Sequence, residues 1–319
     1  MKKIILFAVL SIALCGIACA DFGKSGWTIF TEPQPAKFNL LSLVSLGNPS
    51  LVSVFYNPSV AVMKSQSEVS FFSEIGFADS RMSGVVYAEP LTGGVLTGGF
   101  AYYDAGKMDL NWIENGSVQS SNVTAQRDIM GSASYSFKFE ENIFVGASLK
   151  AATSEIAGAG SATAIALDFG TFYVPEEDIT ISCALQNIGF ASKFEYNSDP
   201  LPSSLFAGIG YHYKYREYGV MPALGFTGNF ADSKTVFDIG SEFSYDNISL
   251  DLGYRANGGE SDVHIGANID LDDLSIGYAF LPGNYLEPTH RINVSYRFGS
   301  VHNYDTYDLL LQRKGLSFD

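Results

Sequence analysis

The chain is poor in basic residues, in cysteine and in long apolar runs. Lys and Arg number 19 against 34 Asp and Glu, and the net charge of −15 argues against nucleic acid as a partner because phosphate binding needs a basic surface. Beyond position 20 no apolar run reaches the length of about 18 residues that a helical membrane span requires. Of the 3 cysteines only Cys183 lies beyond that position, which excludes an intrachain disulfide or a cysteine-based metal site there.

The first twenty residues have the pattern of a signal peptide. Lys2 and Lys3 precede an apolar core at 4–17, and Ala18-Cys19-Ala20 is a small-residue cleavage motif. We expect cleavage after Ala20. Lipid attachment at Cys19 is the alternative, but the position three residues before it is Gly16 and not the usual leucine.

What the chain does contain is aromatic and apolar, with 24 Phe, 18 Tyr and only 17% charged residues. Between 203 and 298, seven successive segments alternate a bulky apolar residue with a small or polar one, which is the period of a β-strand. In 290–298, Ile292 and Tyr296 fall on one face, and Arg291 and Asn293 fall on the other. One face of each segment is apolar and ends in aromatic residues, and the other face carries Gly, Ser and scattered charges. This combination is typical of a transmembrane barrel.

The predicted fold is all-β: a transmembrane antiparallel β-barrel of about 14 strands, within 12–16, over residues 68–298. The segments 108–114 and 118–126 could instead form an extracellular loop, and Pro222 predicts a bulge or break in its strand. The candidate strands are 68–77, 82–90, 93–104, 108–114, 118–126, 128–138, 142–156, 162–174, 179–187, 203–215, 219–230, 234–245, 248–256, 262–269, 274–280 and 290–298.

The ends of the chain do not follow this pattern. Residues 21–67 are apolar without a period of two, and we predict a short helix and turns packed inside or beneath the barrel, with a turn at Asn57-Pro58. Residues 299–319 form a polar tail that we expect in the periplasm.

Charged residues of both signs fall on the predicted inward face. They can pair across neighbouring strands as a structural lumen network that holds the N-terminal segment, or they can form the polar end of a ligand path. The set is Lys150, Asp168, Lys214, Asp238, Glu242, Asp251, Arg255, Arg291 and Arg297.

The sequence does not indicate an enzyme. It contains no Gly-x-Ser-x-Gly, His-Glu-x-x-His or phosphate-binding glycine motif. His212 and His264 fall on the polar face and are expected to point into the lumen, so no lipid-facing Ser–His pair can be identified. We therefore predict no catalytic residue, no metal and no cofactor.

Three motifs, in order along the chain, resemble the PorV/PorQ and UPF0164 outer-membrane proteins, which are relatives of the FadL long-chain fatty-acid transporters. They are GNPSLVSVFYNPSVAVM at 47–63, LQNIGFASKFEYNSDPLPSSLFAGIGY at 185–211 and IGYAFLPGNYLEPTHRINVSYRFG at 276–299. The first resembles the family's aromatic-Asn-Pro turn, although Ser59-Val60-Ala61 replaces the usual Ala-Gly-Leu.

This resemblance implies a barrel in the bacterial outer membrane whose N-terminal segment, residues 21–67, plugs the lumen as a hatch. It places Phe55, Tyr56, Asn57 and Pro58 in or beside that hatch, next to a ligand pocket. The expected partners are outer-membrane lipid and hydrophobic or amphipathic small molecules, taken up passively. The alternative is a PorV-like scaffold that works with secretion-machinery proteins.

Overall fold

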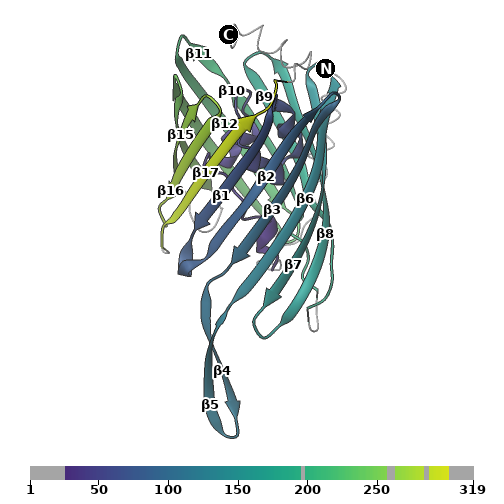
Figure 1. Ribbon diagram of the computed structural model, residues 1–319, viewed down its shortest axis with the longest axis vertical. Helices are drawn as coiled ribbons and strands as arrows, with labels where there is room; N and C mark the ends of the chain where they lie inside the picture. The colour runs from purple at the N-terminus through teal and green to yellow at the C-terminus, as the bar shows by residue number, and fades with distance from the viewer. Residues whose placement is uncertain (1–25, 195–197, 257–262, 284–286, 302–319) are drawn as a thin grey trace.

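The protein is a closed antiparallel barrel with a protruding hairpin, as the computed structural model shows for residues 26–194, 198–256, 263–283 and 287–301 (Figure 1). The predicted signal peptide at 1–20 and most of the predicted tail at 299–319 lie outside these residues. None of the helices in the described residues has the length and hydropathy that a helical membrane span requires.

The wall has 14 strands in meander order, because β10 and β11 are two parts of one interrupted strand. It closes where β1 pairs with β17 and where β10 and β11 both pair with β12. The strands are β1 (Ser67–Ile75), β2 (Arg81–Leu91), β3 (Gly94–Asp104), β6 (Gln126–Glu140), β7 (Ile143–Ile156), β8 (Gly160–Glu176), β9 (Ile179–Ala191), β10 (Ser204–Tyr211), β11 (Tyr213–Tyr215), β12 (Tyr218–Asn229), β13 (Lys234–Tyr245), β14 (Ile248–Ala256), β15 (Val263–Leu271), β16 (Leu274–Leu281) and β17 (Thr289–Phe298).

Two of the candidate strands do not belong to the wall. β4 (Lys107–Glu114) and β5 (Ser117–Thr124) form a separate two-stranded sheet that projects beyond the barrel (Figure 1). At its root the Ala125 N–H donates to the Gly106 carbonyl at 2.9 Å, and β3 then pairs directly with β6. The loop interpretation of this region is therefore the correct one, with the loop folded as a hairpin.

The predicted bulge or break at Pro222 is wrong for its own strand, and the interruption falls in the neighbouring strand instead. β12 pairs with β13 through Pro222 without a register shift. On the other side of β12, the pairing breaks between β10 and β11 at His212, which lies opposite Met221 and next to the position opposite Pro222. Proline has no N–H to donate to the ladder. The His212 N–H instead donates to the Asp178 carbonyl at 2.7 Å.

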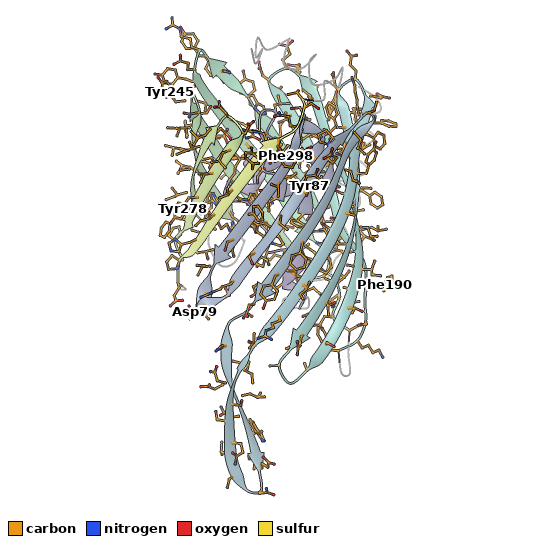
Figure 2. The ribbon with its side chains drawn as sticks, in the orientation of Figure 1. Asp79, Tyr87, Phe190, Tyr245, Tyr278 and Phe298 are labelled. Carbon is orange, nitrogen blue, oxygen red and sulfur yellow. The ribbon has the colours of Figure 1, made fainter. Side chains whose placement is uncertain are left out.

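The two faces of the wall differ as predicted. In β17 the side chain of Ile292 is 49% exposed on the outer surface, while Arg291 next to it is 7% exposed and points inward. Tyr87, Tyr245, Tyr278 and Phe298 likewise project outward (Figure 2). Cys183 is half-buried because it lies in this outward row of β9.

Residues 26–66, the internal segment, lie inside the barrel (purple in Figure 1). Fully buried side chains from this segment, such as Phe30 and Leu41, share one core with Phe144 and Phe172 of the wall. The helices are short, and η4 lies outside this segment in the β1–β2 loop. They are η1 (Thr28–Phe30), α2 (Asn39–Leu43), η2 (Leu51–Phe55), η3 (Pro58–Met63) and η4 (Phe77–Asp79).

Candidate functional site

One side of the internal segment is attached to β7–β9 at Phe55, Tyr56 and Asn57. We call these residues, with Pro58, the anchor. Lys150 Nζ donates to the Phe55 carbonyl at 2.7 Å, and Gln186 Nε2 donates to the Tyr56 carbonyl at 2.9 Å. The four residues that the family resemblance places in or beside a hatch lie together against the wall, and the wall supplies donors to the Phe55 and Tyr56 carbonyls in a dry interior.

Asn57 uses both ends of its side-chain amide. Its Oδ1 accepts from the Ser59 N–H at 3.0 Å and so caps η3, while Pro58 supplies the preset φ at the first position of the helix. Its Nδ2 donates to Ser182 Oγ at 2.9 Å, on β9. One side chain therefore fixes both the turn and its position on the wall.

The wall approaches this turn closely because it carries glycine there. A Cβ at Gly170 would lie 1.8 Å from Asn57 Oδ1, and a Cβ at Gly146 would lie 2.7 Å from the Pro58 carbonyl carbon. Neither distance allows a side chain. Glycine on β7 and β8 is therefore a condition of the anchor.

Replacing Asn57 with alanine is expected to lower the free energy of unfolding by roughly 2–3 kcal/mol, because a helix cap and a buried donor–acceptor pair are lost together. The measurement is urea unfolding of the detergent-solubilised barrel, followed by tryptophan fluorescence. Asn111→Ala on the exposed hairpin is the matched control and should leave the unfolding midpoint unchanged. Equal effects at both positions would contradict the role assigned to Asn57.

Beneath the anchor lies a fully buried ion pair. Lys150 Nζ is 2.7 Å from Asp168 Oδ2, and both side chains are 0% exposed. Asn187 completes the group, since its Oδ1 accepts from Lys150 at 2.9 Å and its N–H donates to Asp168 Oδ1 at 2.7 Å. Such a pair is tolerated away from water because each charge has further hydrogen bonds.

The opposite side of the internal segment meets β13–β17 and β1 through polar contacts, which we call the charged seam. Four ion pairs lie along it: two join the internal segment to the wall, and two join neighbouring strands of the wall. They are Arg255–Asp238 at 2.8 Å, Lys37–Glu242 at 2.5 Å, Lys64–Glu68 at 2.8 Å, and Arg291–Glu74.

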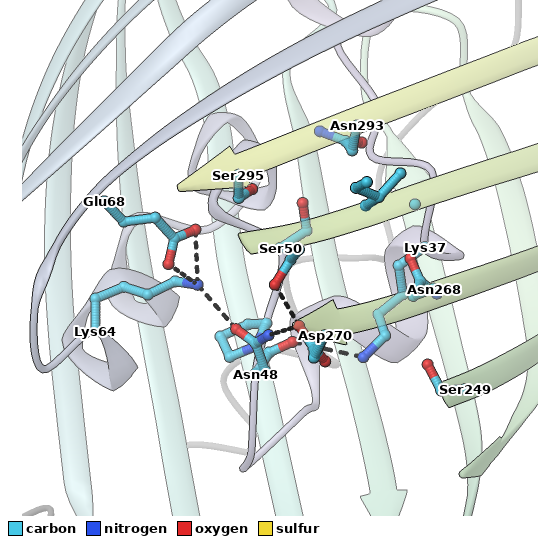
Figure 3. Close-up of a pocket in the computed structure, with 14 residues that line it drawn as sticks. Lys37, Asn48, Ser50, Lys64, Glu68, Ser249, Asn268, Asp270, Asn293 and Ser295 are labelled. Atoms are coloured by element: carbon cyan, nitrogen blue, oxygen red, sulfur yellow. Dashed lines mark hydrogen bonds and ion pairs between the residues drawn. The ribbon is translucent and has the colours of Figure 1, made fainter. Parts of the chain in front are cut away.

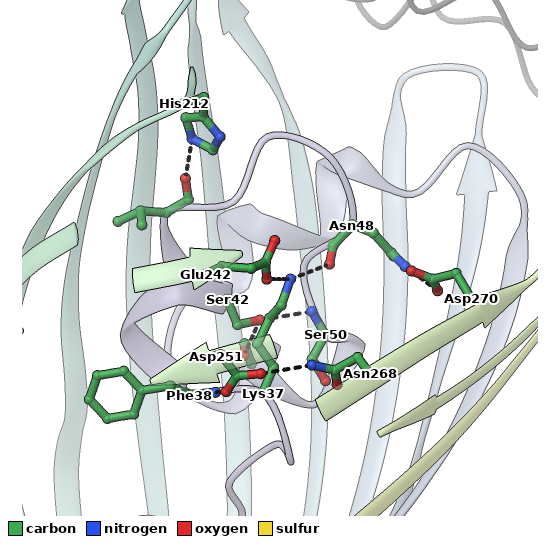
Figure 4. Close-up of polar contacts among 12 residues, drawn as sticks. Lys37, Phe38, Ser42, Asn48, Ser50, His212, Glu242, Asp251, Asn268 and Asp270 are labelled. Atoms are coloured by element: carbon green, nitrogen blue, oxygen red, sulfur yellow. Dashed lines mark hydrogen bonds and ion pairs between the residues drawn. The ribbon is translucent and has the colours of Figure 1, made fainter. Parts of the chain in front are cut away.

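Two further carboxylates of the seam are held mainly by neutral donors (Figure 4). Asp251 accepts from the Phe38 N–H and from Asn268 Nδ2, each at 2.8 Å, and lies 2.9 Å from His264 Nε2. Asp270 accepts from Asn48 Nδ2 at 3.0 Å. The seam therefore carries more carboxylates than basic groups.

The pKa values of two side chains in the internal segment differ from their ordinary values. Burial lowers the pKa of Lys37, but Glu242 and the more distant Asp251 and Asp270 outweigh it, so the pKa is raised and the amine stays protonated at neutral pH. Burial, with the charge of Glu32, raises the pKa of Tyr56, whose neutral hydroxyl donates to the Thr31 carbonyl.

A small polar cleft opens along the seam (Figure 3). Its volume is about 50 Å³, enough for a few water molecules, and it lies between the internal segment and β14–β17 and β1. Lys37, Asn48, Lys64, Glu68 and Asp270 line it. Asn48 bridges the two sides, because its Oδ1 accepts from Lys64 Nζ at 3.2 Å while its Nδ2 holds Asp270.

The structure distributes the predicted lumen charges over two places. Asp168 and Lys150 lie under the anchor, and the seam holds Asp238, Glu242, Asp251, Arg255 and Arg291. Two expectations were wrong. Arg297 turns to the Asp272 carbonyl in the β15–β16 turn, and Lys214 is exposed in β11, because both lie where their strands reach the end of the barrel.

Sequence reasoning missed Lys37, Lys64, Glu68 and Glu74. The two glutamates lie on the inward row of β1, so the period-two pattern could have identified them. The two lysines lie in or beside irregular structure and carried no such signal. Among the described residues, no group of three or more His, Cys, Asp or Glu is arranged to hold a metal ion.

No family model matches the chain, and no curated protein matches it in sequence. Solved structures match its fold. The toluene transporter TodX of Pseudomonas putida is 13% identical with a TM-score of 0.57, and the match covers 83% of this chain and 97% of that one. A TodX deltaS2S3 mutant, described as a monoaromatic hydrocarbon channel, is 11% identical with a TM-score of 0.52, and covers 82% and 99%. A FadL homologue of Pseudomonas aeruginosa is 10% identical with a TM-score of 0.49, and covers 89% and 100%.

The chain therefore has a β-barrel fold like that of TodX. At these identities the likeness concerns the fold alone. Membership of the PorV/PorQ family stays a prediction from the three sequence motifs.

Proposed function

We propose that the protein is an outer-membrane channel for small hydrophobic molecules, with the internal segment as its plug. The observation that carries this proposal is the inverted distribution of side chains. Leu250, Leu252 and Ile276 are among many apolar side chains more than 40% exposed on the outside, while charges line the inside. An outer surface with this many exposed apolar side chains is suited to contact with lipid acyl chains, and the fold shared with TodX supports a channel.

The connections indicate the orientation of the barrel. Short turns such as Asp246-Asn247 and Asp272-Asp273 lie at the end where β1 starts and β17 ends, and the hairpin extends from the opposite end (Figure 1). Barrels of this class have short periplasmic turns and longer extracellular loops. We therefore assign the end with the polar cleft to the periplasm and the hairpin to the cell surface.

The two sides of the internal segment suit different tasks in such a channel. The anchor side is held by close packing on glycine and a dry ion pair. The seam is polar and already contains a cleft, so water can replace its contacts at lower cost. A path for ligand would open along the seam while the anchor keeps the segment in the barrel.

Uptake of labelled toluene by Gram-negative cells tests this function. Porin-deficient cells that carry the protein should take up toluene at low concentration about tenfold faster than cells with an empty vector, because the lipopolysaccharide surface is a barrier to apolar solutes. A rate equal to that of the empty vector, with folded barrel present in the outer membrane, would overturn the proposal. No observation in the described fold favours the alternative implied by the sequence, a scaffold that works with secretion-machinery proteins.

A further inference from the structure

The basic side chains that contact the anchor and the seam are all engaged. In these two places, five Lys or Arg side chains of the described residues each contact a carboxylate. Four lie in the seam and one beneath the anchor. They are Lys37, Lys64, Lys150, Arg255 and Arg291.

The carboxylates of the seam outnumber its basic groups. Four basic side chains face six carboxylates, and the two without a Lys or Arg partner are Asp251 and Asp270. Protonation of His264, 2.9 Å from Asp251, would add one positive charge and still leave a negative surplus. A narrow cleft between low-dielectric walls, with a surplus of charge of one sign, focuses its field on any solute inside it.

A ligand anion in this seam would meet two costs. It would lose its hydration without gaining a free cation, because each Lys or Arg is within ion-pair distance of a carboxylate. It would also be repelled by Asp251 and Asp270, which both lie close to the internal segment through Phe38 and Asn48. A neutral solute meets neither cost, and a cation gains from the surplus.

We infer that the charged seam makes this channel select against anions, so its ligands are uncharged or cationic apolar molecules and not carboxylates or sulfonates. This inference rests on the proposed channel function and names the substrate class of the same site. The ion pairs of the seam thus keep its Lys and Arg side chains unavailable to an anionic ligand, and two of them, Lys37–Glu242 and Lys64–Glu68, also tie the internal segment to the wall.

The test compares three benzene derivatives of similar size in porin-deficient cells that carry the protein. Toluene is neutral, phenyltrimethylammonium is permanently cationic and benzenesulfonate is permanently anionic. The rate in empty-vector cells is subtracted for each compound. The remaining rates for toluene and phenyltrimethylammonium should each be about tenfold higher than the rate for benzenesulfonate. The double variant Glu68→Gln/Glu242→Gln frees Lys64 and Lys37, and should raise the ratio of sulfonate entry to toluene entry, measured in the same cells, about tenfold.

Glu114→Gln on the hairpin removes one negative charge outside the interior and should change none of the rates. Equal entry of sulfonate and toluene would overturn the inference and leave the channel function standing. Entry of none of the three would overturn both. A sulfonate rate that does not respond to Glu68→Gln/Glu242→Gln, in a variant that folds and still passes toluene, would also overturn the inference.

Discussion

Lys150→Met is expected to lower the free energy of unfolding by about 3–5 kcal/mol, one of the two largest effects that the structure predicts, because it leaves Asp168 buried without its counter-charge. The pair is fully buried, and Lys150 also holds the Phe55 carbonyl at the anchor. The side chains of Lys and Met are similar in length, so little packing is lost. Urea unfolding of the purified barrel, read by its mobility on a gel without heating, measures the change.

A double variant separates the charge from the packing. Lys150→Met/Asp168→Asn removes both charges and should cost less than Lys150→Met alone, since no uncompensated carboxylate remains. Lys107→Met on the exposed hairpin is the matched control and should have no effect. If the double variant lost as much free energy of unfolding as Lys150→Met and Asp168→Asn lose when added together, the two residues would not be coupled and the assignment would be wrong.

A disulfide between the internal segment and the seam should block uptake, and a disulfide between the same segment and β10 should not. A Cβ at Gly277 would lie 3.2 Å from Ala36 Cβ, and a Cβ at Gly210 would lie 3.1 Å from Val44 Cβ. Both are shorter than the Cβ separation of about 3.5–4.5 Å in disulfides, so each pair must move apart slightly. The new Cβ at Gly277 must also move away from Asn268 Oδ1, which would lie 2.5 Å from it. Oxidised Ala36→Cys/Gly277→Cys should slow toluene uptake about tenfold, because the seam can no longer part.

Oxidised Val44→Cys/Gly210→Cys is the matched lock, since it ties the same internal segment to β10, where no opening is proposed. It should leave uptake unchanged. Both variants belong in a Cys183→Ala background, which removes the native thiol of the described chain. Reduction should restore uptake to the seam variant. Equal loss with both locks would show that the internal segment moves as a whole, and full uptake with the seam locked would exclude the seam as the path.

The sequence was sufficient for the wall because strands repeat. Alternation at period two identified the inward and outward faces of segments such as 290–298, where Arg291 and Ile292 lie as predicted. It could not distinguish wall strands from a hairpin. β4 and β5 alternate too, and only the direct pairing of β3 with β6 excludes them from the barrel.

The candidate site was predictable only in part. The resemblance placed Phe55 to Pro58 in a hatch, and the structure brings these residues against β7–β9, but nothing in the sequence linked them to Lys150 or Gln186. The partner of Glu242 was also hidden, because Lys37 lies in irregular structure far away in the chain. The residues of such a long-range pair have no fixed spacing in the sequence, so periodicity cannot predict that they meet.

By itself the sequence determined a closed sheet with an apolar exterior and charged rows inside, since the strand period sets which way each side chain points. Only the tertiary structure decided that the internal segment lies against a dry Lys150–Asp168 pair on one side and a surplus of carboxylates on the other. The physical reason is that a side chain's direction depends on its neighbours in the chain, whereas its partner depends on which distant backbone the closed barrel brings within a few ångströms.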